Sequence, residues 1–357
     1  MPNTIIIGSG SYLPTRIIGR DHFMNSEFYT DEGEKLDRPN EEIIQKFVEI
    51  TEIENRRYIE AGQMNSDIGF EAAKEAIADA GVDPETFDYI IFASNFGEVA
   101  ENGFTNFMPN MAARVKNKLG IKNRKCITYD MIFGCPGWVE SMILANNLIK
   151  AGSAKLILVV GAETLSRITD PHDRNKMIFA DGAGAVVVKA TDEENVGIIA
   201  NNTICDNGPE IEYLVNSPSL NKKADQVPIY ITMLGRKIYE YALKNVPVAI
   251  KETIDCANLD ISDIDKILIH QANAKMDYAM IKGLYKLYGI KEYDHSIAPM
   301  TIQEFGNSSV ATIPTMFDLI RKGKMKDQSF ANNGNVVFAS VGAGMNINCV
   351  IYKFPKK

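Results

Sequence analysis

Apolar and polar residues divide the chain into two kinds of segment. Short, nearly continuous apolar runs such as "DYIIFASN" (88–95) and "KLILVVGAE" (155–163) have the composition of strands that are buried on both faces. Longer segments between them repeat apolar residues every three or four positions, which predicts amphipathic helices. "IIIGSGSYLP" predicts a first strand that turns at Gly8 and Gly10. This alternation of strands and helices predicts an α/β fold.

Two pairs of segments repeat within the chain. "KEAIADAGVDPETFDYIIFASN" from Lys74 and "KETIDCANLDISDIDKILIHQA" from Lys251 align without a gap, 177 residues apart, with seven identical positions. Each predicts a helix, a short polar turn and an apolar strand. "GCPGWVESMILANNLIKAG" from Gly134 and "GNSSVATIPTMFDLIRKGK" from Gly306 both place a glycine and a polar or reactive residue before a helix.

The repeats predict two similar βα halves, residues 1–195 and 196–357, joined near residues 190–210. In this scheme Cys135 and Asn307 correspond, each at the start of a helix. His270 ends the strand "KILIH". If the halves pack with pseudo-twofold symmetry, these three residues converge on one pocket.

Composition narrows the class of protein. A chain of 357 residues with 45% hydrophobic and 24% charged residues is typical of a globular protein, and a net charge of −8 argues against nucleic-acid binding. No apolar run approaches the roughly 18 residues of a membrane span, so we expect no membrane insertion. The five cysteines lie far apart without a CxxC pair, and no HExxH occurs. Free thiols, no metal site and a cytoplasmic location are the expectations.

Three residues can carry chemistry. A thiol at a helix start is expected to have a lowered pKa and more thiolate, which makes Cys135 a candidate nucleophile; the alternative is an inert buried cysteine. His270 stands at the end of a strand, where α/β proteins build sites, and can otherwise be a core histidine. Asn307 can be a plain helix cap, although its correspondence with Cys135 argues for a role in the site.

Several motifs together carry a family resemblance. They are the Cys135 helix start, "HQAN" from His270, "GNSSVATIP" from Gly306, "VGAGM" from Val341, and "TDPHDRNKMIFADGAGAVVV" at 169–188. The chain resembles the thiolase superfamily nearly end to end, and within it β-ketoacyl-acyl-carrier-protein synthase III. The resemblance implies a thiolase-like fold in which two pseudo-symmetric halves form a five-layered α-β-α-β-α core.

The resemblance also implies a reaction. Cys135 would take an acyl group from an acyl-CoA, and the acyl-enzyme would meet malonyl-acyl carrier protein. His270 and Asn307 would bind the malonyl thioester carbonyl while CO2 leaves, and the carbanion would attack the acyl group. The amides of Cys135 and Ala343 would form an oxyanion hole. No metal or redox cofactor is needed, and a homodimer is implied.

Substrate contacts are expected by the same resemblance at Arg174, Met108, Trp138 and Phe305. Arg174 keeps a CoA-contact arginine, whereas Lys46 and Ile50 replace the tryptophan and arginine that often hold the adenine. Met108 lies in "NGFTNFMPN", the expected pocket loop that crosses the dimer interface. These departures resemble branches of secondary metabolism, so the alternative is the condensation of a longer or aryl acyl group with a different, β-keto acceptor.

A carrier-protein dock is predicted on the helix after "HQAN". Lys275, Lys282 and Lys286 are 7 and 4 residues apart and share one face, which can steer an acidic acyl carrier protein, with Arg236 adding to it. A solvated lysine face is the alternative for each.

Three other classes fit the sequence less well. A papain-like hydrolase shares the order Cys, His, Asn but lacks the residues expected around its cysteine. A degradative thiolase needs a second catalytic cysteine near "GAG", and Cys349 lies too far beyond it. A non-catalytic scaffold does not explain Cys135, His270 and Asn307 together.

Overall fold

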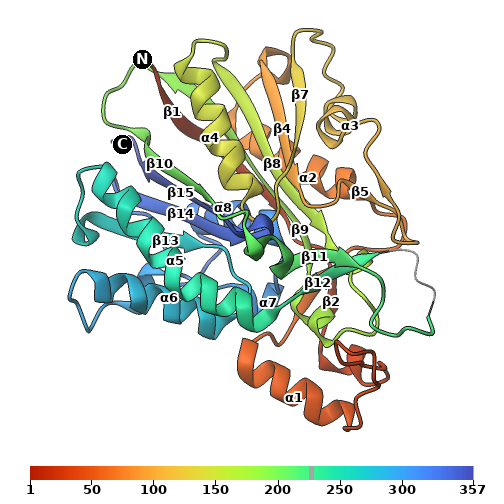
Figure 1. The fold of residues 1–357 in the computed structure, drawn as a ribbon. Coiled ribbons are helices and arrows are strands. Elements are labelled where there is room, and N and C mark those ends of the chain that lie inside the picture. The colour runs from red at the N-terminus through yellow and green to blue at the C-terminus, as the bar shows by residue number, and fades with distance from the viewer. Residues whose placement is uncertain (225–228, 357) are drawn as a thin grey trace.

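A computed structural model of the chain describes residues 1–224 and 229–356. Its main strands form two mixed sheets (Figure 1). The first has the order β1-β9-β8-β4-β7, with β1 (Asn3–Tyr12), β4 (Tyr89–Ser94), β7 (Ile127–Ile132), β8 (Leu156–Thr164) and β9 (Asp181–Thr191). The second has the order β10-β15-β14-β13, with β10 (Gly197–Cys205), β13 (Ile264–Ile269), β14 (Asn335–Gly342) and β15 (Asn346–Lys353).

The two sheets share one topology, as the repeats predict. In the first, β4 pairs parallel with β8, which pairs antiparallel with β9, and β9 pairs antiparallel with β1. In the second, β13, β14, β15 and β10 repeat these orientations in the same order. The strand β7 extends only the first sheet, so the symmetry is incomplete. Residues 192–196 connect the sheets; the division into halves at residue 195 stays a prediction.

Helices form three layers around the two sheets. The layers are formed by α2 (Asn65–Ala80), α3 (Met111–Lys118), α4 (Gly137–Lys150), α5 (Gly235–Cys256), α6 (Ala274–Leu287) and α8 (Thr312–Arg321), whereas α1 (Asn40–Thr51) and α7 (Ile302–Phe305) contribute to a separate apolar cluster. The central layer holds α4 and α8, whose side chains pack in one apolar cluster with both sheets. Helices α2 and α3 cover the outer face of the first sheet, and α5 and α6 that of the second. The predicted α-β-α-β-α arrangement is confirmed.

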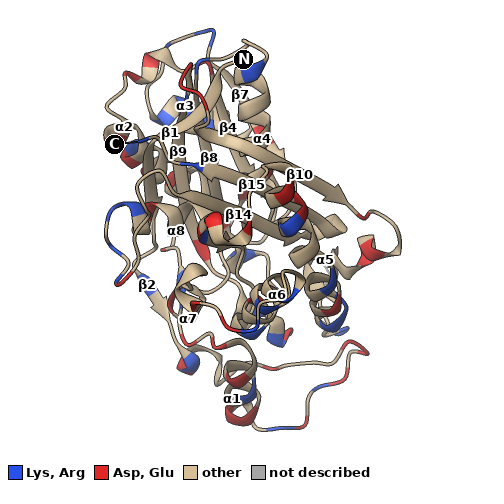
Figure 2. Cartoon of the chain, turned by 90° about the vertical axis from the view of Figure 1, so that its left-hand side faces the viewer, with Lys and Arg blue, Asp and Glu red and all other residues tan. Residues whose placement is uncertain are grey.

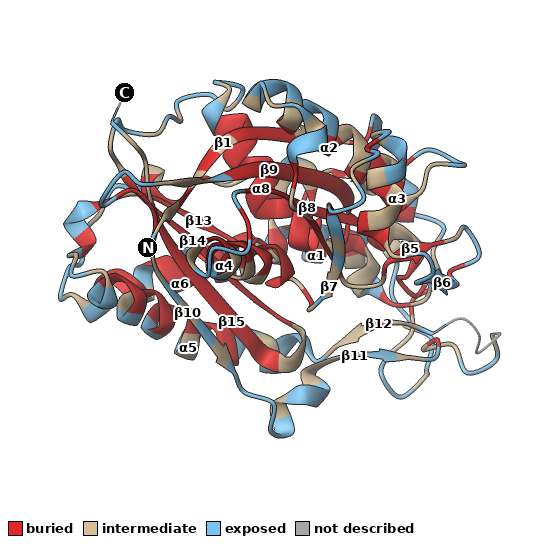
Figure 3. Cartoon of the chain, turned by 90° about the horizontal axis from the view of Figure 1, so that it is seen from above, coloured by how far each residue is buried: buried red, intermediate tan, exposed pale blue. Residues whose placement is uncertain are grey.

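Burial follows from this layering. The inner strands β8, β13 and β14 are almost entirely buried, and the edge strand β7 is not, whereas α2 and α3 are exposed on their outer sides (Figure 3). The strand β8 is buried at all nine positions, which explains its unbroken apolar run. The helix α8 is buried at nine of its ten, because it lies between two sheets instead of on the surface.

The predicted turn at Gly8 and Gly10 is wrong, because β1 runs through both residues. A Cβ on Gly8 would lie 2.4 Å from the carbonyl oxygen of Ala76, and one on Gly10 would lie 2.3 Å from that of Ala72. The glycines therefore allow α2 to pack directly on the strand. Glycine is needed here for close packing, and in the sequence alone it looks the same as a turn signal.

Three two-stranded ribbons complete the described strands. They are β2 (Arg16–Ile18) with β3 (Arg56–Tyr58), β5 (Glu98–Val99) with β6 (Thr105–Asn106), and β11 (Leu214–Ser217) with β12 (Tyr230–Met233). The last of these ribbons contributes residues to the wall of the cavity described below.

Candidate active site

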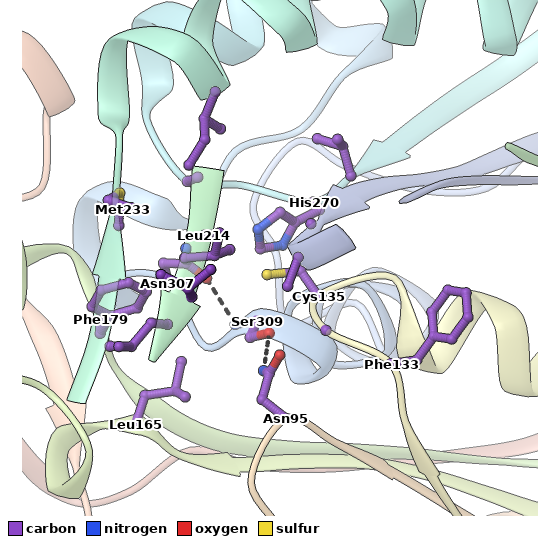
Figure 4. A pocket seen from close by; sticks show the side chains of 18 of the residues that line it. Asn95, Phe133, Cys135, Leu165, Phe179, Leu214, Met233, His270, Asn307 and Ser309 are labelled. Carbon is purple, nitrogen blue, oxygen red and sulfur yellow. Dashed lines mark hydrogen bonds between the residues drawn. The ribbon is translucent and has the colours of Figure 1, made fainter. Parts of the chain in front are cut away.

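A cavity of about 310 Å³ opens where the two sheets and the central helices meet. Cys135, His270 and Asn307 all line it, although 135 and 37 residues separate them along the chain. Figure 4 shows the sulfur of Cys135 and the imidazole of His270 facing the same space, with Asn307 on the opposite wall. The structure thus brings the three predicted residues together.

Cys135 lies two residues before the first residue of α4, after a tight turn. Gly134 has φ +81°, and a Cβ there would lie 3.1 Å from the amide nitrogen of Ala343. Gly342 packs closely against the same turn, since a Cβ on it would lie 2.8 Å from the amide nitrogen of Cys135. Two glycines therefore let the end of β14 approach the cysteine backbone closely.

The predicted lowering of the Cys135 pKa is wrong. Burial raises the pKa of the thiol to about 11, and a hydrogen bond with the Ser309 side chain opposes that rise. A helix start favours an anion, but the helix begins among apolar side chains, so loss of hydration outweighs the dipole. The side chain nevertheless keeps a partly exposed surface on the cavity.

His270 follows β13 directly and is 3% exposed. Its backbone N–H donates to the carbonyl of Ala339, 2.8 Å away, which continues the pairing of β13 with β14. Burial lowers the pKa of the imidazole to about 4, so the ring is neutral near pH 7. A neutral ring can donate one hydrogen bond into the cavity without bringing a charge.

The sequence predicted Asn307 at the start of a helix, and this prediction is wrong. Asn307 forms a β-bridge with Phe179, and the 3-10 turn Ser309–Ala311 stands between it and α8. Its Oδ1 accepts the N–H of Ser309 at 2.8 Å, so the Nδ2 group is directed away from that bond. Asn307 and Cys135 correspond in that each precedes a helix of the central layer. They differ in local backbone structure, because a 3-10 turn separates Asn307 from α8.

Three further polar residues near Cys135 were missed by the sequence reasoning. Asn95 and Ser309 line the cavity, and Glu163 is buried behind them at 1% exposure. The Nδ2 of Asn95 donates to the Oγ of Ser309 at 2.7 Å, and its backbone N–H donates to the Oε1 of Glu163 at 2.7 Å. Two of them could have been found from their positions at predicted strand ends, because Asn95 follows β4 and Glu163 lies near the end of β8.

The residues expected to bind substrate lie apart from the cavity wall. Trp138 is 1% exposed in the core, against the ring of Phe338. Met108 is 84% exposed and Arg174 is exposed, while Phe305 is half-buried against Arg57. Their roles in substrate binding stay predictions.

The predicted docking residues lie on one side of the molecule. Lys275, Lys282 and Lys286 are all exposed on α6, and Lys and Arg mark the outer surfaces of α5 and α6 (Figure 2). Arg236, in the first turn of α5, pairs with Glu240 at 2.9 Å and has a side chain that is 91% exposed.

Within residues 1–224 and 229–356, no cluster of His, Cys, Asp or Glu is arranged to hold a metal ion. Over the same residues, no helix is both long and apolar enough to cross a bilayer.

Comparison with known proteins places this geometry in a family. Residues 129–207 match the model of 3-oxoacyl-[acyl-carrier-protein] synthase III, and residues 254–354 match that of its C-terminal part. A β-ketoacyl-[acyl-carrier-protein] synthase III of Erythrobacter litoralis is 30% identical over 99% of this chain and 100% of its own. One of Clostridium acetobutylicum is 32% identical over all of both chains.

A solved structure of a protein with the same family name has the same fold. The 3-oxoacyl-[acyl-carrier-protein] synthase III of Aquifex aeolicus superposes with a TM-score of 0.78 and 27% identity, over 98% of this chain and 100% of that one. With the cavity, the fold and both family models in accord, the chain belongs to the β-ketoacyl-[acyl-carrier-protein] synthase III family of thiolase-like condensing enzymes.

Proposed function

We propose that the protein joins an acyl thioester to malonyl-acyl carrier protein, with loss of CO2, to give a β-ketoacyl-acyl carrier protein. The observation that carries the proposal is that Cys135, His270 and Asn307 all line one cavity. A nucleophile and two uncharged donors suit a reaction that forms an acyl-enzyme and then an enolate.

In the first step the thiolate of Cys135 attacks the carbonyl of an acyl-CoA. A tetrahedral oxyanion forms, then collapses to a new thioester on the enzyme as the CoA thiolate leaves. The amides of Cys135 and Ala343 are the proposed oxyanion donors, and the close approach at Gly134 and Gly342 supports this placement. Covalent capture separates one difficult condensation into two easier steps.

In the second step malonyl-acyl carrier protein enters the same cavity. His270 and the Nδ2 group of Asn307 donate to its thioester carbonyl and stabilise the enolate that forms as the carbon–carbon bond to CO2 breaks. The carbanion attacks the acyl carbonyl on Cys135, and the cysteine thiolate leaves. A His270 pKa of about 4 supports this role, because a neutral ring can donate without a proton being lost to the carbanion.

The acyl chain would occupy the apolar part of the cavity. Its lining there includes Leu165, Phe179, Leu214 and Met233 (Figure 4), together with Phe96. Such a wall favours a hydrocarbon chain over a charged acyl group, because burying a charge there would lack compensation.

We further propose a homodimer and a carrier-protein dock. The edge strand β7 exposes Ile127, Tyr129 and Ile132, between 40% and 48% of each, and an edge of this kind can pair with a second copy. The basic face formed by Lys275, Lys282 and Lys286 complements an acidic carrier. Five free cysteines support a cytoplasmic location.

The experiment is a panel of acyl-CoAs of varied length, branching and aromaticity, each incubated with malonyl-acyl carrier protein. Mass spectrometry of the carrier should show a β-ketoacyl product together with one CoA released per turnover, and none with Cys135→Ala. The panel is repeated with a β-ketoacyl thioester in place of malonyl-acyl carrier protein. Product formed only with that acceptor would replace this proposal with the alternative condensation.

A further inference from the structure

Ser309 has a backbone conformation that serine rarely adopts. Its φ is +52°, in the left-handed region, and its side chain lies against the cavity while the residue is 2% exposed. A residue with a Cβ pays a free-energy cost in this region, and such conformations gather at functional sites. The conformation is held by the hydrogen bond from its N–H to the Oδ1 of Asn307.

The hydroxyl of Ser309 interacts with two side chains, those of Asn95 and Cys135. Its Oγ accepts a hydrogen bond from the Nδ2 of Asn95 at 2.7 Å. A hydroxyl carries a single hydrogen, and among the described residues no oxygen or nitrogen receives it. The thiol of Cys135 lines the same cavity as Ser309. Interaction with the Ser309 side chain lowers the pKa of the Cys135 thiol and so favours its thiolate form.

Asn95 fixes the direction of that bond. Its Nδ2 group donates both to Ser309 and to the Oε1 of Glu163, and its backbone N–H donates to the same carboxyl oxygen. Because both Nδ2 hydrogens are committed, the amide cannot turn to offer its oxygen to Ser309. The Ser309 hydrogen is therefore left free to point to sulfur.

Glu163 holds Asn95 without adding a charge near the cysteine. Burial raises the pKa of its carboxyl to about 8, and the neighbouring Asp181 adds to that rise. An ionised Glu163 would disfavour the Cys135 thiolate, whereas the protonated acid still accepts from Asn95. The other titratable group facing the cavity, His270, is neutral near pH 7.

We propose that Glu163, Asn95 and Ser309 form a relay of hydrogen bonds that aims the Ser309 hydroxyl at the sulfur of Cys135 and stabilises its thiolate. In this proposal Ser309 contacts the reacting sulfur and acts as a catalytic residue, and Asn95 and Glu163 position it. Ser309 keeps its hydrogen throughout, so no proton is transferred by the relay. The inference deepens the proposed function, on which it rests for the identity of Cys135 as the nucleophile.

The test follows alkylation of Cys135 by iodoacetamide between pH 7 and 11, read by mass spectrometry of the peptide that contains it. The exposed Cys205 in the same sample serves as reference for the reagent. We expect Ser309→Ala and Ser309→Gly to shift the Cys135 profile upward by about one pH unit, or about tenfold in rate at a fixed pH below the midpoint. Asn95→Ala should give about a threefold loss.

Two pairs of variants separate the relay from general damage. Ser309→Gly relieves the left-handed backbone that Ser309→Ala retains, so the hydroxyl explains the effect only if both variants shift. Glu163→Leu should shift the profile, and Glu163→Gln, which keeps an accepting oxygen, should restore it. Ser308→Ala is the matched control: its hydroxyl contacts Thr312, 3.4 Å away, and the profile should not move.

Two results would overturn the relay: an unshifted profile in both Ser309 variants, or a shift in only one of them. Alkylation needs no acyl substrate, so the relay and the proposed function can fail separately. A shifted profile in a protein that condenses no acyl-CoA would keep the relay and remove the function.

Discussion

Replacement of Gly342 by alanine tests the fit between β14 and the cysteine turn. Gly342 has φ −169° and ψ −161°, an extended conformation open to any residue, so alanine brings no backbone strain. The added Cβ would lie 2.7 Å from Cδ of Pro136, 2.8 Å from the amide nitrogen of Cys135 and 2.9 Å from its Cβ. All three atoms belong to the turn that holds Cys135, the proposed nucleophile.

The size of the effect follows from these distances. Ordinary contacts need about 3.5 Å, so the turn must move by about 0.6 to 0.8 Å. Overpacking of this kind costs about 1–3 kcal/mol of stability. A displacement of about 1 Å at a reacting group costs about 10²-fold in rate. We therefore expect Gly342→Ala to remain folded and to lose about 100-fold in the rate of Cys135 acylation.

The assay is single-turnover acylation by an acyl-CoA, followed by quenching and intact-mass spectrometry, with a thermal melt on the same protein. Gly19→Ala is the matched control, because a Cβ there would meet its nearest atom, Oδ1 of Asn55, at 3.6 Å. Acylation by Gly342→Ala within about twofold of the unaltered protein would refute the claim that this contact places the nucleophile.

Three further outcomes follow from the structure. His270→Ala and Asn307→Ala should still be acylated but should lose decarboxylation of malonyl-acyl carrier protein by about 10²–10³-fold; loss of acylation alone would contradict their roles. Burial holds the Glu163 pKa at about 8 against an ordinary 4.5, so the folded protein loses stability as pH rises from 4.5 to 8. Glu163→Gln should remove this loss, so its stability relative to the unaltered protein should rise by about 4 kcal/mol between pH 4.5 and 8 in urea titrations; a constant difference would mean that Glu163 ionises in the fold with an ordinary pKa. Lys282→Glu with Lys286→Glu should raise the KM for the carrier about tenfold at low salt and leave acylation by acyl-CoA unchanged; equal KM values would remove this face as the dock.

The repeated pattern was enough to predict the architecture. The segments from Lys74 and Lys251 became α2 with β4 and α5 with β13, because a helical period followed by an apolar run reports directly which faces are buried. The same correspondence brought His270 to the cavity, since equivalent strands end at equivalent places. Local signals were weaker: Gly8 and Gly10 suggested a turn, whereas the helix that packs on them lies about 70 residues further along the chain.

The electrostatics of the site could not be predicted from local sequence. The helix start beside Cys135 suggested a lowered pKa, but burial, which depends on the whole fold, raised it. Glu163 was missed for the same reason, because its hydrogen bonds go to Asn95, 68 residues away. Trp138 is close to Cys135 in sequence but lies in the core, because this face of α4 packs against Phe338 of β14.

Acylation of Cys135 is the measurement that tests the account most directly. The protein is incubated with acyl-CoAs in the absence of malonyl-acyl carrier protein, and its intact mass and the Cys135 peptide are then analysed. The account predicts one acyl group, on Cys135, which is discharged when malonyl-acyl carrier protein is added. An unmodified Cys135, or equal acylation of Cys135→Ser, would contradict it.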